Sequence, residues 1–339
     1  MGWFDFMQEA IAIDLGTANT LIIYNDKVVV DEPSIVAKNI RTGDVVAIGT
    51  KAQQMHGKTH KEIETLRPLK DGVIADFQSS EQMIRGFIGM IPRKRSIFSP
   101  ALKMVICIPS GVTEVEKRAV IDSAEHAGAK DVWLIHEPMA AAIGIGIDVL
   151  EPKGNMVIDI GGGTSDIAVI SLSAIAYGES VRVAGDAIDE SIARYMRINH
   201  SLNIGIFEAE RIKTEIGSAY PLLGKLSTQV KGLNVQTGVP TSTEIFDEEI
   251  RLAMQEPILM ITSVIMKALE KTPPELSADI HSNGIYLTGG GALIRGLDKL
   301  IEEQTSLKVY KPTEPLLSIV KGAGAVLSDY EKMKAVCIN

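Results

Sequence analysis

Two apolar runs separated by a glycine-rich turn form the clearest pattern in the chain. Residues 156–160 and 167–170 are largely apolar, and residues 161–164 between them read Gly-Gly-Gly-Thr. Apolar runs of this length, bounded by turn residues, predict the two strands of a hairpin. Because the three glycines carry no Cβ, consecutive N–H groups can point into one concavity, which favours an anion such as phosphate.

The same order of residues occurs near the start of the chain. Residues 11–24 give an apolar run that contains Asp14, then Gly16 in a small polar turn, then a second apolar run. Asp14 corresponds to Asp159, and Gly16 corresponds to Gly161. A single glycine-rich turn is most often an ordinary bulge or corner, whereas two copies predict a duplicated α/β domain with a nucleotide clamped between its halves.

A carboxylate precedes the second turn directly. Asp159 stands at the end of the incoming strand, where bound phosphates would repel it unless a cation lay between them. Mg²⁺ takes one or two carboxylates and keeps several waters. We therefore expect Mg²⁺ at this position.

Strands and helices alternate after the first hairpin. The pattern predicts a helix over residues 79–90, a strand over 103–108 and a helix up to Gly128 that starts at a capping box of Thr113 and Glu116. Elements of this length in this order are typical of a doubly wound α/β domain.

The next predicted strand, residues 133–135, ends at His136, Glu137 and Pro138. Sites in α/β proteins form outside the ends of sheet strands. Glu137 is therefore a candidate to orient or deprotonate a water. The same position also suits a cap for a helix that begins at Pro138, and the local sequence does not separate these two interpretations.

The second half continues with helices and a further hairpin. A helix is expected over residues 185–200, and a long helical stretch over 246–269 is expected to be interrupted at Pro257. Between them, Glu210 and Lys213 are three residues apart and share a helix face. On periodicity alone they form an ordinary surface ion pair.

The last predicted strand, residues 285–287, leads into a turn of Gly289, Gly290, Gly291 and Ala292. The spacing does not match the dinucleotide fingerprint. We expect these glycines to allow a base or ribose to lie flat against the backbone.

Composition narrows the class of protein. With 339 residues and 45% hydrophobic residues, the chain is long enough for two cores. A formal net charge of -9 argues against nucleic acid as the main partner. The two cysteines give no disulfide framework or metal spacing, and the first residues lack the basic region of a signal peptide. A cytoplasmic location is therefore expected.

The motifs DLGTANT, DIGGGTSD and LTGGGA together resemble the two phosphate motifs and the adenosine motif of the actin, heat-shock chaperone and sugar kinase superfamily. Five further stretches, DEPSIVA, RPLKDGVIADF, EPMAAAIG, TPPELSADI and LTGGGALIRGL, are similar to those of the MreB family of bacterial actins, which determine rod shape. The likeness runs from about residue 11 to residue 327.

The resemblance implies an actin-like ATPase fold of two duplicated α/β domains, each with a small inserted subdomain, and a nucleotide cleft between them. The first half would comprise residues 1–150, with an insertion at about 33–71, and residues 316–339 would return to it. The second half would comprise residues 151–315, with an insertion at about 186–244.

The resemblance also implies a role for individual residues. ATP and Mg²⁺ would be the cofactors, Asp14 and Asp159 would hold Mg²⁺ through water, and Glu137 would activate the attacking water, with Thr164 as the second catalytic candidate. The residues expected to contact the nucleotide are Asp14, Gly16, Thr17, Ala18, Asn19, Asp159, Gly161, Gly162, Gly163, Thr164, Glu210, Lys213, Gly289, Gly290, Gly291 and Ala292.

Two positions depart from the family pattern. His136 stands where many members have an acidic residue, which changes the charge beside Glu137. Asn19 stands where eukaryotic actins have Lys, so that neutralisation of the phosphates depends more on the metal.

The function implied is that of a filament-forming ATPase on the inner face of the cytoplasmic membrane, where it directs cell shape and cell-wall synthesis. Its partners would be copies of itself, the membrane surface and membrane proteins of cell-wall elongation. Ile97 and Phe98, in a basic loop, are the expected membrane contact. The alternative is a sugar-kinase-type phosphotransferase, although both inserted subdomains are small for shaping an acceptor pocket.

Overall fold

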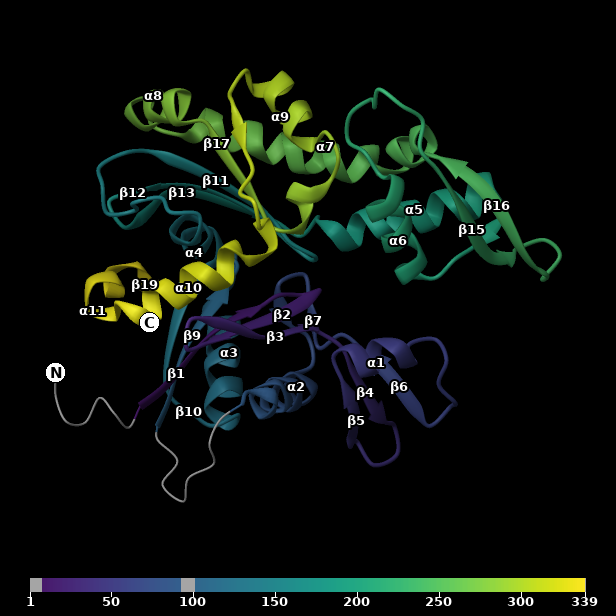
Figure 1. The fold of residues 1–339 in the computed structure, drawn as a ribbon, viewed down its shortest axis with the longest axis horizontal. Helices are drawn as coiled ribbons and strands as arrows, with labels where there is room; N and C mark the ends of the chain where they lie inside the picture. The colour runs from purple at the N-terminus through teal and green to yellow at the C-terminus, as the bar shows by residue number, and fades with distance from the viewer. Residues whose placement is uncertain (1–7, 93–100, 339) are drawn as a thin grey trace. The chain divides into compact units, whose positions relative to one another are not determined.

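A computed structural model describes residues 8–92 and 101–338 of the chain (Figure 1). The chain divides into two compact units. Unit 1 comprises Met1–Glu151 and Leu317–Asn339, and unit 2 comprises Pro152–Leu316. Each unit has its own hydrophobic core.

Unit 1 is built on a mixed six-stranded sheet in the order β19-β10-β9-β1-β2-β3. The first three strands in the sequence form an antiparallel meander, and β1 also pairs in parallel with β9, which pairs in parallel with β10. The strands are β1 (Gln8–Leu15), β2 (Asn19–Tyr24), β3 (Lys27–Pro33), β9 (Ala101–Ile108), β10 (Ala129–His136) and β19 (Cys337–Ile338).

Unit 2 repeats this arrangement with a five-stranded sheet in the order β13-β12-β11-β17-β18. Again a meander of three strands is joined, through its first strand, to two parallel strands. The strands are β11 (Asn155–Ile160), β12 (Ser165–Ser171), β13 (Ala174–Val181), β17 (Ile285–Thr288) and β18 (Val309–Tyr310). The matching strand orders confirm the predicted duplicated α/β fold.

Helices cover both faces of the unit 1 sheet (Figure 1). On one face, α2 (Phe77–Met90) and α3 (Glu114–His126) contribute Met83, Phe87 and Val120 to the core, and α3 starts at the predicted capping box. On the other face, α4 (Glu137–Gly144) packs on α10 (Ser318–Ser328). Their backbones approach so closely that a Cβ on Gly322 would lie 1.8 Å from the Ala140 carbonyl oxygen.

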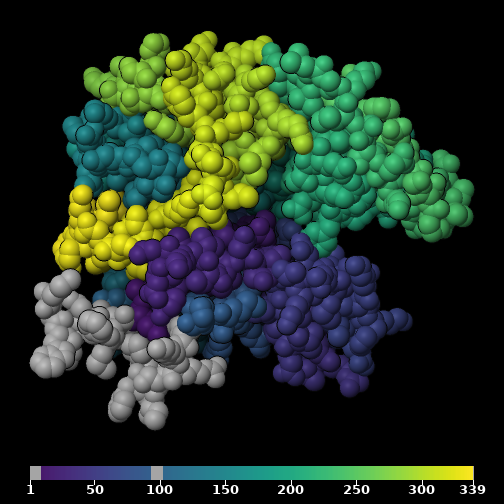
Figure 2. Space-filling view, viewed as in Figure 1, coloured from purple at the N-terminus to yellow at the C-terminus, as the bar shows by residue number. Residues whose placement is uncertain are grey.

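Each unit also carries a smaller sheet. In unit 1 it consists of β4 (Val36–Asn39), β5 (Val45–Ile48) and β6 (Ile63–Leu66) with helix α1 (Thr50–Met55), followed by the short pair β7 (Leu69–Lys70) and β8 (Val73–Ile74). In unit 2 it consists of β14 (Leu202–Asn203), β15 (Ser227–Asn234) and β16 (Pro240–Phe246). Figure 2 shows the β15 and β16 region, in green, as a lobe of unit 2.

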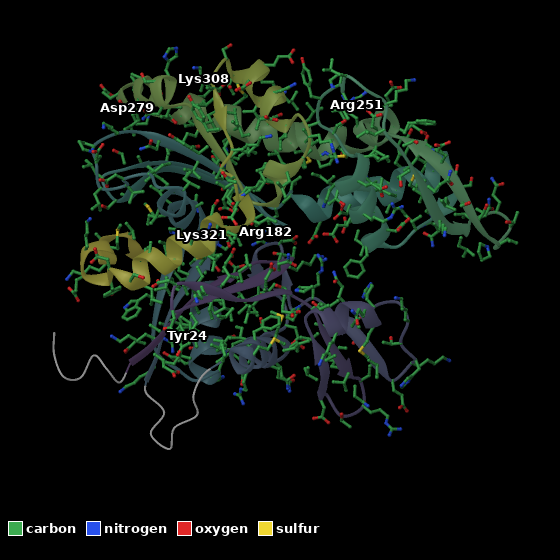
Figure 3. The ribbon with its side chains drawn as sticks, in the orientation of Figure 1. Tyr24, Arg182, Arg251, Asp279, Lys308 and Lys321 are labelled. Atoms are coloured by element: carbon green, nitrogen blue, oxygen red, sulfur yellow. The ribbon has the colours of Figure 1, made fainter. Side chains whose placement is uncertain are left out.

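The helices of unit 2 pack around a core that the sequence pattern predicts in part. Ile188, Ile192 and Met196 lie on one face of α5 and are fully buried, as expected. Arg251 on α7, labelled in Figure 3, donates to Asp247 Oδ2 at 3.3 Å near the start of the same helix. The helices are α5 (Gly185–Asn199), α6 (Ile206–Ile216), α7 (Asp247–Lys271), α8 (Pro274–Asn283) and α9 (Leu297–Thr305).

Helix α7 corrects the prediction of an interruption at Pro257, because the helix continues through this residue. Proline has no N–H, so the carbonyl of Ala253 loses its helical donor. Ser191 Oγ on α5 donates to that carbonyl at 2.7 Å and replaces the missing bond. Among the described residues, α7 is also the one helix whose length and composition suit a membrane span, but one face of it belongs to the core of unit 2, and we interpret it as a core helix.

Candidate functional site

The turn of the first hairpin is fixed by Ser34, which follows β3. Its N–H donates to the Ala18 carbonyl at 2.8 Å, and its hydroxyl donates to the Gly16 carbonyl at 2.6 Å. The Gly72 N–H donates to Thr17 Oγ1 at 3.0 Å. A Cβ on Gly16 would lie 2.7 Å from the Asn19 carbonyl oxygen, so this position requires glycine.

The turn of the second hairpin is held in a similar way. The Gly161 N–H closes the turn by donating to the Thr164 carbonyl at 2.9 Å. The carbonyls of Gly161 and Gly162 accept from the N–H groups of Gly185 and Asp186, at 3.2 and 2.8 Å, where α5 begins. In both hairpins, therefore, a neighbouring segment donates to two carbonyls of the turn and fixes the direction of its peptide planes.

Each turn follows a buried carboxylate. Asp14 is 7% exposed and Asp159 is 2% exposed. Asp159 is opposite Asp166 in the β11 and β12 pair, and Thr288 Oγ1 donates to Asp159 Oδ1 at 2.9 Å. Burial raises the pKa of Asp159 to about 7; the Thr288 hydrogen bond lowers it and the Asp166 charge raises it. Burial disfavours the charged form of this carboxyl, and a nearby cation would favour it.

The third glycine-rich turn packs directly on the second. Gly289 follows β17 with a φ of 74°, and a Cβ there would lie 2.5 Å from the Ile160 carbonyl oxygen. A Cβ on Gly291 would lie 2.4 Å from the Ile160 side chain. Gly290 is exposed, whereas Ala292 is buried. The structure therefore brings residues 289–292 and the turn that follows Asp159 together at the end of β11.

Glu137 lies at the same edge of the unit 1 sheet as Asp14. Strands β1, β9 and β10 are parallel, and their register aligns Asp14 with Cys107 and Cys107 with Ile135. The positions are two strands apart, which corresponds to about 10 Å. Glu137 follows two residues after Ile135 and is 6% exposed.

Glu137 is the first residue of its helix and not the residue before it. Helix α4 begins at Glu137 itself, and His136 occupies the N-cap position without a side-chain cap bond. Burial lowers the pKa of His136; its bond to the Pro109 backbone raises it and the Lys117 charge lowers it. The side chain next to Glu137 is therefore a largely uncharged imidazole at neutral pH.

Lys213 is paired with Asp189, and not with Glu210 as helical periodicity alone would suggest. Its ammonium donates to Asp189 Oδ2 on α5 at 2.8 Å and to the Gly185 carbonyl at 3.2 Å. The side chains of Lys213 and Asp189 are 13% and 3% exposed, so this pair is an interior one. Burial raises the pKa of Asp189 to about 7, Lys213 lowers it, and the charges of Glu210 and Asp186 raise it.

Carboxylates are the candidate metal ligands of this region. Within residues 8–92 and 101–338, no group of three or more His, Cys, Asp or Glu side chains could hold an ion. Each unit presents one buried carboxylate before its turn, Asp14 in unit 1 and Asp159 in unit 2, and a carboxylate oxygen is a ligand of the kind that Mg²⁺ takes.

Several residues that hold the site residues in place are not identified by the sequence alone. Ser34, Thr288 and Asp189 each bind a predicted site residue or its turn from a distant part of the chain. Ile97 and Phe98 lie outside the described residues.

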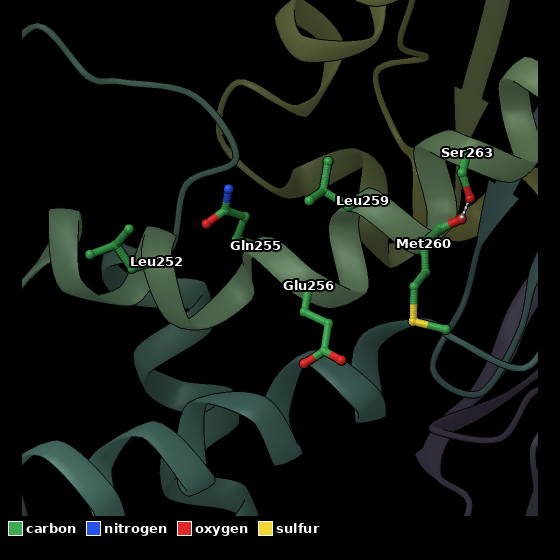
Figure 4. Close-up of a pocket in the computed structure, with 6 residues that line it drawn as sticks. All are labelled: Leu252, Gln255, Glu256, Leu259, Met260 and Ser263. Atoms are coloured by element: carbon green, nitrogen blue, oxygen red, sulfur yellow. Dashed lines mark hydrogen bonds between the residues drawn. The ribbon is translucent and has the colours of Figure 1, made fainter.

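A surface hollow of about 510 Å³ lies elsewhere, along the outer side of α7. Leu252, Leu259 and Met260 line it together with Gln255, Glu256 and Ser263, and Figure 4 shows these side chains along a single helix. Its lining contains one acidic side chain, Glu256, and none of the residues of the three glycine-rich turns.

A family model described as MreB/Mbl protein matches residues 8–335. The chain belongs to the MreB/Mbl family. The cell shape-determining protein MreB of Escherichia coli strain K12 is 48% identical over 322 residues, which cover 94% of this chain and 92% of the relative. The cell shape-determining protein Mbl of Bacillus subtilis strain 168 is 41% identical over 324 residues, 95% of this chain and 97% of the relative.

The fold is that of this actin-like family. The crystal structure of MreB5 of Spiroplasma citri bound to AMPPNP superposes with a TM-score of 0.90 at 36% identity and covers 96% of this chain and 97% of that one. The expected resemblance to MreB-family bacterial actins is thus confirmed over nearly the whole chain.

Proposed function

We propose that this chain is an ATP-binding and ATP-hydrolysing cytoskeletal protein that assembles into filaments and determines cell shape. The observation that carries the proposal is the pair of hairpins, each with a buried carboxylate followed by a turn whose carbonyls are already bonded. The same family includes MreB5 of Spiroplasma citri, solved with AMPPNP and with ADP, which supports a nucleotide as the ligand.

The two turns would bind the phosphates. Because neighbouring segments occupy turn carbonyls, the N–H groups of residues 16–18 and 162–164 are the groups that would face an anion. Asp14 and Asp159 would hold Mg²⁺ through water. When bound, Mg²⁺ neutralises charge on the phosphates and stabilises the charge that develops during transfer. A cation bound there would favour the ionised form of the Asp159 carboxyl, whose pKa burial raises to about 7.

Hydrolysis would depend on Glu137 and Thr164. Glu137 is buried at the carboxyl edge of the unit 1 sheet, where it can accept a proton from a water or orient it. Thr164 is the last residue of the phosphate turn of unit 2, and its hydroxyl would donate to or accept from the attacking water. The neutral His136 adds no charge beside Glu137, where many family members carry an acidic residue.

The adenosine would lie against residues 289–292, with Glu210 and Lys213 at its ribose. Gly290 is the glycine of this turn that would let a flat group approach the backbone, because its Cβ position meets only Leu316 Cδ2 at 3.6 Å, whereas Gly289 and Gly291 pack on Ile160. Glu210 and Lys213 supply an acceptor and a donor on one face of α6.

The alternative is a phosphotransferase of the sugar kinase type, in which a substrate hydroxyl replaces water. Phosphate release without an acceptor is the experiment that separates the two classes. Purified protein with Mg-ATP and no sugar should release phosphate, and the protein should pellet on ultracentrifugation. If phosphate is transferred only when a sugar is added, and the protein stays in the supernatant, the proposal is wrong.

We further propose that the filaments form in the cytoplasm on the inner face of the membrane and meet membrane proteins of cell-wall elongation. A basic segment with Ile97 and Phe98 is the proposed contact. Burying each apolar side chain would contribute about 1.5–3 kcal/mol, and many copies on one filament would add avidity. Co-sedimentation of an Ile97→Ser, Phe98→Ser variant with anionic liposomes tests this, and undiminished binding would contradict it.

A further inference from the structure

Lys213 has one hydrogen-bond donor left for a ligand. An ammonium carries three N–H groups. One of them is bonded to Asp189 Oδ2 at 2.8 Å and a second to the Gly185 carbonyl at 3.2 Å. Because both acceptors lie on α5, the direction of the third N–H is set by this helix.

Gly185 places that ammonium beside the second phosphate turn. A Cβ built on Gly185 would lie 3.4 Å from Lys213 Nζ and 3.2 Å from the Gly161 carbonyl oxygen. A side chain at this position would crowd both groups, so the Lys213 ammonium and the Gly161 carbonyl lie against the same residue.

Burying Asp189 costs folding free energy, so its presence is not explained by stability. It is 2% exposed, and its Oδ1 has no hydrogen-bond partner among the residues that the structure describes. Its neighbours on the buried face of α5, Ile188 and Ile192, are apolar, and Glu210 and Asp186 add negative charge nearby. A half-satisfied buried carboxylate costs free energy, which is expected where a residue serves a site rather than the fold.

The neighbouring Glu210 identifies the kind of ligand group. Glu210 and Lys213 lie one turn apart on α6 and offer one acceptor and one donor. The Glu210 carboxylate would repel a phosphate. A pair of neighbouring hydroxyls, as in ribose, can donate to the carboxylate and accept from the ammonium.

We propose that Asp189 is a positioning residue that holds the Lys213 ammonium so that its remaining N–H is directed to the ribose hydroxyls of the bound nucleotide. This inference rests on the proposed nucleotide-binding function. Asp189 acts through Lys213 and does not touch the nucleotide itself.

The test is a double-mutant cycle on the full chain, measured by calorimetry with two ligands. Mg-ATP contains the ribose, and Mg-tripolyphosphate does not. Asp189→Asn should weaken Mg-ATP binding about tenfold, the size of one charge-assisted hydrogen bond, and leave tripolyphosphate binding unchanged. In a Lys213→Gln background, Asp189→Asn should have no further effect.

Glu190→Gln is the matched control, because Glu190 is the next residue on α5 and is exposed. An equal loss for both ligands, or an equal loss in the Lys213→Gln background, would show that Asp189 only supports the fold. If Asp189→Asn does not fold, as its melting temperature would report, Asp189→Ser takes its place. Wild-type protein that fails to bind Mg-ATP contradicts the proposed function, whereas wild-type binding that Asp189→Asn leaves unchanged contradicts this inference alone.

Discussion

Thr288 Oγ1 donates to Asp159 Oδ1 at 2.9 Å, across the parallel pair of β17 and β11. This bond joins two glycine-rich turns that are far apart in the sequence. It also orients a carboxyl that burial keeps at a pKa of about 7. The motif proposed for Mg²⁺ and the motif proposed for adenosine are therefore parts of one hydrogen-bonded edge of the unit 2 sheet.

The carboxylates at positions 14 and 159 are expected to act through the metal. Asp14→Asn or Asp159→Asn should weaken Mg-ATP binding about 10- to 100-fold, the range for partners that hold a metal indirectly, and should weaken metal-free ATP binding less. Calorimetry with Mg²⁺ and with a chelator measures both values. Asp44→Asn, at an exposed position, is the control. Equal losses for the two ligands would indicate misfolding and not a lost metal contact.

Glu137→Ala should separate binding from turnover. If Glu137 positions the attacking water, phosphate release should slow by about 10²- to 10⁴-fold while ATP still binds. Glu125→Ala, an exposed glutamate on α3, should leave the rate unchanged. Hydrolysis by Glu137→Ala at the wild-type rate would place the general base elsewhere.

The close approach of α4 and α10 predicts opposite effects at two helical glycines. In Gly322→Ala, the new Cβ would meet the Ala140 backbone, which cannot move aside, so stability should fall by about 1–3 kcal/mol or more. Gly89→Ala on α2 meets nothing within 4 Å and should gain about 1 kcal/mol of helix propensity. Urea unfolding measures both, and a Gly322→Ala protein as stable as wild type would contradict the packing described.

Asp189 predicts a pH dependence of stability in the absence of ligand. Its pKa is about 7 in the folded chain against 3.8 for an ordinary aspartate, because burial outweighs Lys213 and the charges of Glu210 and Asp186 add to it. Between these values the folded state keeps a proton that the unfolded state has lost, so this group's contribution to stability falls as pH rises from about 4 to 7. Relative to wild type, Asp189→Asn should therefore be more stable at about pH 8 than at about pH 5. Urea unfolding measures the free energy of unfolding of both proteins at both pH values. If the difference between variant and wild type is the same at the two pH values, the raised pKa is wrong.

The sequence predicts the parts of this structure that depend on neighbouring residues. The hairpins around Gly16 and Gly161 follow from apolar runs and glycines, and the start of α3 follows from Thr113 and Glu116. The local sequence is sufficient to predict these elements, because strand formation and helix capping depend on residues that are close in the sequence.

The sequence does not reveal bonds between distant elements. Pro257 predicts a break because proline lacks an N–H, but the replacement donor, Ser191, lies on another helix. Lys213 suggests a surface pair with Glu210, but it is bound by Asp189, which no periodic pattern links to it. Both errors concern partners that are chosen by tertiary packing.

The most direct test of the account is whether nucleotide and the two carboxylates control assembly. Purified chain is incubated with Mg-ATP, pelleted by ultracentrifugation and viewed by electron microscopy, beside an Asp14→Asn, Asp159→Asn double variant with the same melting temperature. The account predicts filaments in the wild-type pellet and a double variant that stays largely in the supernatant. Wild-type protein that binds Mg-ATP but forms no filaments, or a double variant that assembles as readily as wild type, would contradict it.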